Sequence, residues 1–167
     1  MLGGKRVKLD IGSGDHPYDP VRYISVDAFN DKAEVKAEMW DLPYKDGEID
    51  EIYASHCLEH AAIAKVPETL KEWHRVLKPA GRCIIQVPNM DYIAKYWLTG
   101  PDRPWAEAML FGLQTHDGEF HKSAFTAAII KADCEAAGFE VKRVEVRWNY
   151  NQETLQCVCV KPTEIKV

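Results

Sequence analysis

The residues with the clearest chemical pattern are Asp10, Gly12 and Gly14, which directly follow an apolar run near the start of the chain. A glycine has no Cβ, so its backbone can adopt positive φ and lets a ligand approach the main chain closely. After the first strand of an α/β sheet, such a turn usually holds a nucleotide-type cofactor. A second acid, Asp27, follows the apolar run 23–26 and can accept hydrogen bonds from ribose hydroxyls. The pattern therefore predicts a cofactor site at the carboxyl ends of two strands.

The spacing of the glycines argues against a dinucleotide cofactor. A dinucleotide fingerprint has a third glycine three residues after the second, and this position holds Pro17. Asp15, beside the turn, would repel a pyrophosphate, and the stretch 13–22 is too short and too rich in proline and aspartate for a complete helix. A cofactor with a ribose but no phosphate, such as S-adenosylmethionine, fits these acids better than NAD or FAD.

The composition is that of one domain with a sizeable core: 167 residues, 46% of them apolar. No signal peptide and no run long enough to span a bilayer is visible, so we expect a cytoplasmic protein without a membrane partner. The net charge of −5 argues against a nucleic-acid partner. The five cysteines form no CxxC motif, and we expect reduced core residues, with Cys157 and Cys159 packed on one face of a strand.

Strand and helix patterns alternate along the chain, which indicates parallel strands joined by crossovers. We expect strands over 6–11, 23–26, 34–38, 49–54 and 82–87, and a closing hairpin of strands 141–147 and 155–160. Helices are expected over 66–77 and 123–137, the second ending at Gly138. The segment 88–121 is irregular and rich in aromatic residues (Tyr92, Tyr96, Trp97, Trp105, Phe111 and Phe120). It is interpreted either as an acceptor pocket or lid, or as packing onto the sheet or a dimer surface.

Five segments, taken in order, resemble the class I S-adenosylmethionine-dependent methyltransferases, and most of all small members with a type 11 methyltransferase domain. They are Leu-Asp-Ile-Gly-Ser-Gly (9–14), Ser-Val-Asp (25–27), Asp-Leu-Pro-Tyr (41–44), Ile-Asp-Glu-Ile-Tyr-Ala-Ser-His-Cys-Leu-Glu-His (49–60) and Arg-Val-Leu-Lys-Pro-Ala-Gly-Arg (75–82). The resemblance covers roughly residues 5–90. It implies an α/β, Rossmann-like fold in a single domain over 1–167, with a mostly parallel seven-stranded sheet, a C-terminal antiparallel hairpin and helices on both faces. Because 13–22 is so short, the first crossover helix should be shortened or absent.

The resemblance also implies roles for particular residues. The turn Gly12-Ser13-Gly14, with Asp10 beneath it, would hold the methionine end of the cofactor, and Asp27 its ribose. Ala28 and Phe29 would lie near the adenine, and Ser55 is a further cofactor contact. The family's adenine-binding acid falls on Glu38, followed by Met39, with Asp41 as the competing assignment. The family's further glycine is His16 here, and the helices that often cover the site are not seen before the first strand, so a lid would come from 88–121 or from a second subunit in a homodimer.

Methyl transfer from a sulfonium needs an aligned acceptor and, for many acceptors, a base that removes its proton. A histidine with a pKa near the reference value of about 6.5 suits an oxygen or nitrogen acceptor. His56, directly after the strand 49–54, is the first candidate catalytic residue, or else a wall residue. His121, in the cluster 116–121, is the second, or else part of an exposed polar turn. We expect methylation of a small molecule, and a sugar or other cell-surface precursor is suggested by where small family members are found.

Two other functions fit parts of the sequence. His56-Cys-Leu-Glu-His60 spells the HxxEH motif of inverted zinc proteases, in which Glu59 would act as general base and Glu135 is the nearest candidate for the third ligand. The flanking methyltransferase segments make this match a coincidence, and we expect no metal. A non-catalytic cofactor-binding or scaffold domain is the main alternative, suggested by His16 and the missing helix.

Overall fold

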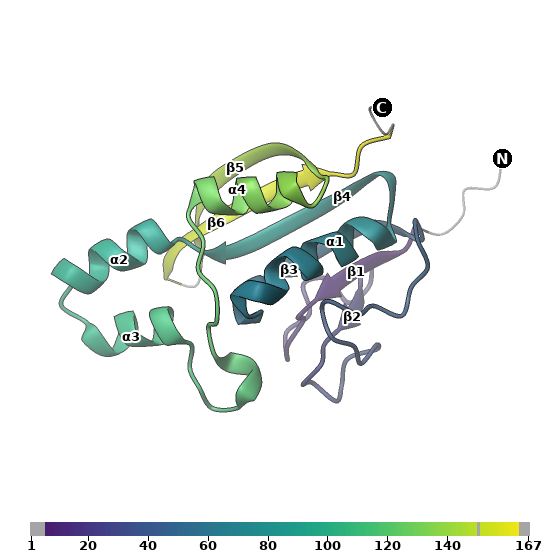
Figure 1. The fold of residues 1–167 in the computed structure, drawn as a ribbon. Helices are drawn as coiled ribbons and strands as arrows, with labels where there is room; N and C mark the ends of the chain where they lie inside the picture. The colour runs from purple at the N-terminus through teal and green to yellow at the C-terminus, as the bar shows by residue number, and fades with distance from the viewer. Residues whose placement is uncertain (1–5, 150, 164–167) are drawn as a thin grey trace.

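A computed structural model describes residues 6–149 and 151–163, which form one mixed sheet with helices beside it (Figure 1). Its strands are β1 (Lys8–Ile11), β2 (Ile24–Val26), β3 (Ile49–Ser55), β4 (Leu77–Pro88), β5 (Glu140–Asn149) and β6 (Gln152–Val160). Within the described residues the sheet has six strands in the order β2-β1-β3-β4-β6-β5. The first four pair in parallel, and β6 is antiparallel to both β4 and β5. This arrangement confirms the Rossmann-like sheet and the C-terminal hairpin; Tyr150, in the expected hairpin turn, lies outside the described residues.

Seven strands were expected, and the one over 34–38 is reduced to a single parallel bridge between Val35 and Val26. The side chain of Glu34 explains part of this, because its Oε2 accepts the hydrogen bond of the Ser25 N–H at 3.0 Å. A carboxylate therefore takes a place that a backbone carbonyl would hold in a regular ladder.

The helices are α1 (Val66–Val76), α2 (Met90–Thr99), α3 (Arg103–Phe111) and α4 (Ala127–Ala136). The helices expected over 66–77 and 123–137 correspond to α1 and α4. The segment 88–121 differs from expectation, because α2 and α3 lie within it. Each of these starts at a capping side chain: Asn89 accepts from the Asp91 N–H, and Asp102 from the Trp105 N–H. Such capping residues favour the start of a helix.

None of the helices in the described ranges is long and apolar enough to cross a membrane.

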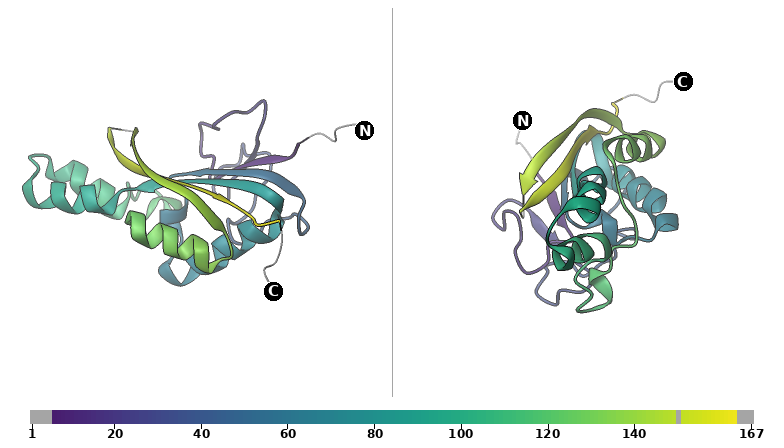
Figure 2. Two further views of the ribbon diagram at one scale, coloured as in Figure 1. Left: turned by 90° about the horizontal axis from the view of Figure 1, so that it is seen from above. Right: turned by 90° about the vertical axis from the view of Figure 1, so that its left-hand side faces the viewer.

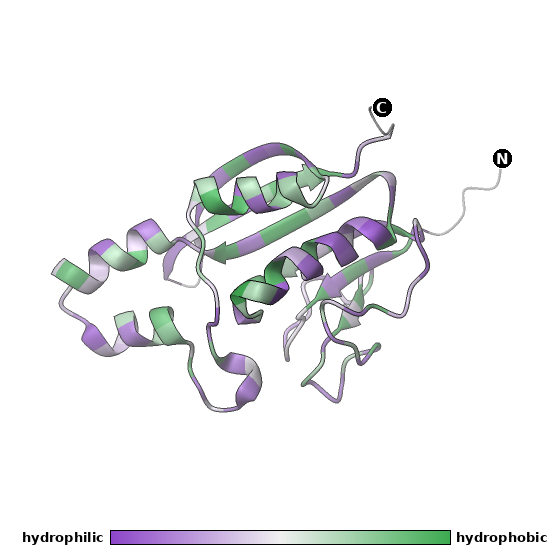
Figure 3. Cartoon of the chain, viewed as in Figure 1, coloured by the Kyte–Doolittle hydropathy of each residue, from purple (hydrophilic) through white to green (hydrophobic). Residues whose placement is uncertain are grey.

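Both α1 and α4 pack on the same face of the sheet, whereas α2 and α3 extend beyond its end (Figure 2). The strands place buried apolar side chains toward this helical face, among them Leu9, Ile11, Ile52, Ala54, Ile85 and Cys159. Hydrophobic and hydrophilic residues alternate along β4 and along α1, as expected for elements that bury one side (Figure 3).

The opposite face of the sheet carries no helix among the described residues (Figure 2), so the expectation of helices on both faces is wrong. On this face, Gln86 of β4 links the two neighbouring strands. Its Oε1 accepts from the hydroxyls of Tyr53 and Ser55 on β3, and its Nε2 donates to Gln156 on β6. The connections from β1 to β2 and from β2 to β3 contain turns, bends and isolated bridges but no helix. The missing first crossover helix is thus confirmed, and the second crossover lacks one as well.

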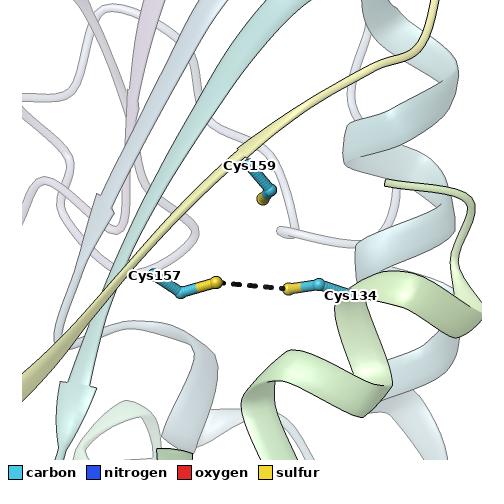
Figure 4. A group of neighbouring side chains, drawn as sticks. All are labelled: Cys134, Cys157 and Cys159. Carbon is cyan, nitrogen blue, oxygen red and sulfur yellow. Dashed lines mark hydrogen bonds between the residues drawn. The ribbon is translucent and has the colours of Figure 1, made fainter. Parts of the chain in front are cut away.

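The cysteines pack as expected, because all five are free and buried. Cys157 and Cys159 both project from β6 toward α4, and the Cys157 sulfur lies 4.0 Å from that of Cys134 (Figure 4). Contact with the other two thiols, together with burial, raises the pKa of the Cys134 thiol. These sulfurs therefore fill the space between β6 and α4.

Candidate functional site

A cavity of about 790 Å³ opens at the carboxyl ends of β1, β2 and β3. Five segments line it: the turn after β1, the end of β2 with residues 27–31, residues 37–40, the turn after β3, and residues 116–119 with Lys122. In an open α/β sheet, ligands bind outside the carboxyl ends of the strands. The cavity therefore lies at the edge of the sheet where the sequence places the cofactor.

The glycine turn forms one side of this cavity. Gly12 has φ +68°, and a Cβ built on it would lie 2.5 Å from the Sγ of Cys57. Gly14 has φ +53°, and a Cβ there would have no atom within 4 Å, so its main chain borders open space. The two glycines therefore serve different needs: Gly12 permits close packing against the turn after β3, and Gly14 leaves room for a ligand.

Asp27 lines the cavity and also holds its edge together. Its Oδ2 accepts from the Gly14 N–H at 2.9 Å, while Oδ1 accepts from the N–H groups of Phe29 at 2.8 Å and Asn30 at 2.9 Å. Because a carboxylate has about four lone-pair sites, one site on Oδ2 is left for a ribose hydroxyl. The Asp27 carboxylate can therefore accept a hydrogen bond from one ribose hydroxyl while it keeps its three hydrogen bonds from backbone N–H groups.

Three residues expected at the cofactor lie off the cavity. Asp10 is 3% exposed, and its Oδ2 accepts from the Tyr18 N–H at 2.8 Å, which ties down the loop after the glycine turn. Burial raises the pKa of this carboxyl. Ser13 is buried, and the Ser55 hydroxyl donates to Gln86 at 3.0 Å. None of these three side chains lines the cavity.

Glu38 and Met39 line the cavity, and Asp41 does not. The indole of Trp73, fully buried on α1, holds this segment by donating to the Met39 carbonyl at 2.8 Å. Of the two acids that the sequence left open for the adenine, Glu38 is thus the one on the cavity wall. His16, which suggested a non-catalytic domain, is exposed and does not line the cavity.

The cavity wall is strongly acidic. Its carboxylates are Asp15, Asp27, Asp31, Glu38, Asp117 and Glu119, and Lys122 is the one lysine or arginine among the lining residues. A field of this sign attracts a cationic ligand and repels a phosphorylated one. The lining therefore fits S-adenosylmethionine, which carries a sulfonium and an ammonium group, and it fits a pyrophosphate poorly.

His56 lies on the cavity wall at the turn after β3. Its backbone has φ +50°, while its N–H continues the ladder of β3 by donating to the Gln86 carbonyl at 2.9 Å. This left-handed residue turns the chain sharply, so that the following Cys57 packs beneath Gly12. The imidazole Nδ1 lies 3.3 Å from Glu59 Oε1, and Nε2 lies 3.4 Å from the Thr154 hydroxyl.

The turn 116–119 covers another side of the cavity, and it belongs to the segment 88–121 that the sequence offered as a pocket or lid. The His116 ring lies 5.6 Å from the Phe29 ring, and its Nδ1 accepts from the Gly118 N–H at 3.1 Å. The sequence offered the cluster 116–121 either as part of the site or as an exposed polar turn, and residues 116–119 line the cavity. Three aromatic residues of the segment 88–121 pack away from it, since Tyr92, Tyr96 and Trp105 contact one another between α2 and α3.

His121 does not line the cavity. Its Nδ1 lies 2.9 Å from the Met109 carbonyl, and burial lowers its pKa. Burial alone would raise the pKa of the neighbouring Glu59, but His56, His60 and His121 around it lower that pKa by more. Glu135, the nearest candidate for a third zinc ligand, lies on α4 and pairs with Lys131 at 3.2 Å, and among the described residues it forms no close ligand group with His56 and His60.

Residues 19–85 match a family model described as a methyltransferase domain. The fold agrees with three methyltransferase structures of low sequence identity. A didemethyltoxoflavin N1-methyltransferase from Burkholderia thailandensis, with bound S-adenosylhomocysteine, has a TM-score of 0.68 at 21% identity, covering 96% of this chain and 73% of that one. The chain therefore has the fold of the class I S-adenosylmethionine-dependent methyltransferases.

Two further structures share this fold. A methyltransferase from Archaeoglobus fulgidus has a TM-score of 0.69 at 17% identity, covering 95% of this chain and 87% of that one. A possible histamine N-methyltransferase from Thermotoga maritima has a TM-score of 0.68 at 17% identity, covering 96% and 84% of the two chains. A search of curated proteins found no match. Because these identities are low, the shared fold leaves both the cofactor and the acceptor to be inferred from the chain's own residues.

Proposed function

We propose that this chain is an S-adenosylmethionine-dependent methyltransferase that methylates an oxygen or nitrogen of a small molecule that is neutral or cationic. The observation that carries the proposal is the acidic wall of the cavity beside the glycine turn. An acceptor bearing phosphate or several carboxylates would be repelled by this wall, whereas an amine, a heterocyclic nitrogen or a sugar hydroxyl would not. The toxoflavin enzyme, named as an N1-methyltransferase, and the possible histamine N-methyltransferase support a nitrogen acceptor.

When bound, S-adenosylmethionine supplies a methyl group on a sulfonium, and its displacement releases a neutral thioether. The chain's own residues bind and align the two reactants. In this proposal the main chain at Gly12 and Gly14 borders the methionine end, Asp27 binds a ribose hydroxyl, and Glu38 lies at the adenine end. Asp10 acts on the cofactor indirectly, because it fixes the loop at Tyr18.

His56 is the proposed contact for the acceptor. It lies on the cavity wall, and its ring is fixed between the Glu59 carboxylate and the Thr154 hydroxyl. A ring fixed in this way can align an acceptor by a hydrogen bond without a large loss of side-chain entropy. His121 does not line the cavity, and its contribution would be to position the wall at His60, whose ring lies 5.0 Å away.

The first experiment is calorimetric titration of the purified protein with S-adenosylhomocysteine, with NAD as control. Micromolar binding of S-adenosylhomocysteine alone is expected, and binding of NAD alone would contradict the site. Labelled S-adenosylmethionine would then be incubated with separate pools of amines, heterocycles, sugars and phosphorylated analogues. Transfer to the phosphorylated pool in preference to the others would refute the charge argument.

The His56 assignment is tested with His56→Ala and His56→Gln on the acceptor found. Both variants should bind S-adenosylhomocysteine within a few-fold of the parent, because the ring is not among the proposed cofactor contacts. The glutamine variant, which can still form hydrogen bonds, should recover part of the KM that the alanine variant loses. Equal turnover and KM in all three proteins would remove His56 from the acceptor site.

A further inference from the structure

Three side chains next to the cavity form a cluster with the composition of a metal site. One ligand atom from each of Glu59, His60 and His121 lies within 4.8 Å of the others. Glu59 is 1% exposed, and within the described residues neither of its carboxylate oxygens has a hydrogen-bond donor. His56 Nδ1 lies 3.3 Å from Oε1, which is an ion-pair distance without the alignment of a hydrogen bond. A buried carboxylate left in this way is costly unless a cation accompanies it.

The two imidazoles of this cluster are oriented as metal ligands usually are. His60 Nδ1 lies 3.2 Å from the Phe120 carbonyl, and His121 Nδ1 lies 2.9 Å from the Met109 carbonyl. Because a carbonyl oxygen only accepts, each Nδ1 must carry the proton, which leaves a lone pair on each Nε2. Metal-bound histidines characteristically donate their second ring N–H to a carbonyl or carboxylate in this manner.

The backbone around the cluster is fixed on both sides. The Glu59 carbonyl accepts from the N–H groups of Lys122 at 2.8 Å and Ser123 at 3.1 Å, and the Ser123 hydroxyl donates to the Leu58 carbonyl at 3.3 Å. The turn after β3 is thereby tied to the segment that carries His121. The three ligand groups are therefore held in place by contacts of the protein itself, which reduces the entropy cost of binding an ion.

We propose that Glu59, His60 and His121 bind a divalent transition-metal ion at the wall of the cavity. Two imidazoles and one carboxylate suit zinc and similar ions, whereas magnesium and calcium prefer oxygen ligands only. Three protein ligands leave coordination positions open, and His60 and the neighbouring His56 line the cavity. If the proposed function holds, the ion can bind and polarise an oxygen or nitrogen of the acceptor; this second step rests on that function.

The proposed ligands differ from those of the HxxEH zinc-protease motif. There the two histidines bind the ion and the glutamate acts as base. Here Glu59 is a ligand, His121 replaces His56, and His56 lies beside the carboxylate. A short 3-10 turn over Leu58–His60 explains the difference, since the five residues are not on one α-helix and the two histidines of the motif do not share a helix face.

The test uses the full chain produced without a polyhistidine tag and stripped with a chelator. Cobalt(II) is titrated while its visible absorption is followed, and zinc content per chain is measured after dialysis against zinc. The test variants are Glu59→Gln and His121→Gln, which keep side-chain volume, and the control is His16→Ala, which removes an exposed histidine away from the cavity. S-adenosylhomocysteine binding is measured for every protein as the check on folding and on the cofactor site.

The expected result is one ion per chain in the parent and in His16→Ala, with a rise in Tm on adding zinc, because an ion that binds only the folded state stabilises it. Glu59→Gln and His121→Gln should lose the ion and the Tm rise while still binding S-adenosylhomocysteine. Two results would overturn the site: no ion in a parent that binds S-adenosylhomocysteine, which would make the cluster an internal ion pair, or full binding in both variants, which would place the ion elsewhere. Ion binding without S-adenosylhomocysteine binding would instead support the site and refute the proposed function.

Discussion

The two glycines of the cofactor turn should respond differently to the same substitution. Gly12→Ala places a methyl group 2.5 Å from Cys57 Sγ and 2.6 Å from its Cβ, in addition to the strain of φ +68°. Gly14→Ala has the strain of φ +53° and no atom within 4 Å. The left-handed conformation costs roughly 1–2 kcal/mol for alanine, and overpacking a fixed neighbour adds about 1–3 kcal/mol. We therefore expect a loss in unfolding free energy of about 2–5 kcal/mol for Gly12→Ala and about 1–2 kcal/mol for Gly14→Ala.

Cofactor affinity should show the opposite order among molecules that remain folded. The Cβ of Gly14→Ala projects beside the cavity, where the ligand would approach the main chain, so S-adenosylhomocysteine should bind at least tenfold more weakly. Gly12→Ala points its methyl group at Cys57, behind the turn. Its folded fraction should therefore keep an affinity nearer to that of the parent.

The assays are urea unfolding for stability and calorimetry for affinity, and Cys57→Gly provides the internal control. This change removes both atoms that the new methyl group meets and leaves the Cys57 Cα 3.6 Å away. In the double variant the overpacking part, about 1–3 kcal/mol, should be recovered as a coupling energy, while the strain of φ remains. Equal stability losses for the two glycine variants, with no coupling to Cys57→Gly, would refute the packing explanation.

Three further predictions concern the surrounding residues. Asp27→Asn should weaken S-adenosylhomocysteine binding by about 1.5–3 kcal/mol, the range of a hydrogen bond to a charged group. Asp41→Asn, whose side chain does not line the cavity, should leave the calorimetric affinity unchanged. Equal losses of affinity in the two variants would place the ribose elsewhere. Burial would raise the pKa of Glu51, but hydrogen bonds from Tyr23 and a lysine lower it by more. The ionised Glu51 should therefore add to the free energy of unfolding above pH about 4.5. This contribution should be lost as pH falls through the lower pKa of the folded state. Acid-unfolding curves should therefore be flatter for Glu51→Gln, and a slope equal to the parent's would refute this. Trp105→Ala should speed hydrogen exchange in α2 and α3 without weakening S-adenosylhomocysteine binding, because its ring packs between those helices; a loss of affinity with unchanged exchange would contradict this.

The strands that carry the site could be predicted from sequence because local pattern and tertiary role coincide there. The run before Asp10 and the run before Asp27 are short, apolar and followed by turn residues, and both form β-strands in the structure. The segment 34–38 has a similar pattern, but the Glu34 side chain takes the Ser25 N–H that a third strand would need. A side chain that competes with the backbone in this way leaves no mark on the periodicity of the sequence.

The segment 88–121 was misjudged for a different reason. Two short helices, α2 and α3, each begin at one capping side chain, Asn89 and Asp102, and a cap leaves no trace in an apolar periodicity. Three of the aromatic residues that suggested a lid, Tyr92, Tyr96 and Trp105, instead join the two helices, with a Tyr96–Trp105 ring distance of 4.5 Å. Aromatic density alone therefore cannot distinguish a ligand pocket from a packing contact, because both require large apolar surfaces.

The HxxEH segment shows how a motif can be present while its geometry is changed by the fold. In a continuous helix, His56 and His60 would lie on one face and Glu59 beside them. Here β3 continues through the N–H of His56, whose φ of +50° then reverses the chain before the 3-10 turn. This turn directs Glu59 into the protein, where the segment before α4 brings His121 beside it. Sequence spacing alone could not reveal the partnership, because it joins residues 62 positions apart through the Lys122 and Ser123 contacts to the Glu59 carbonyl.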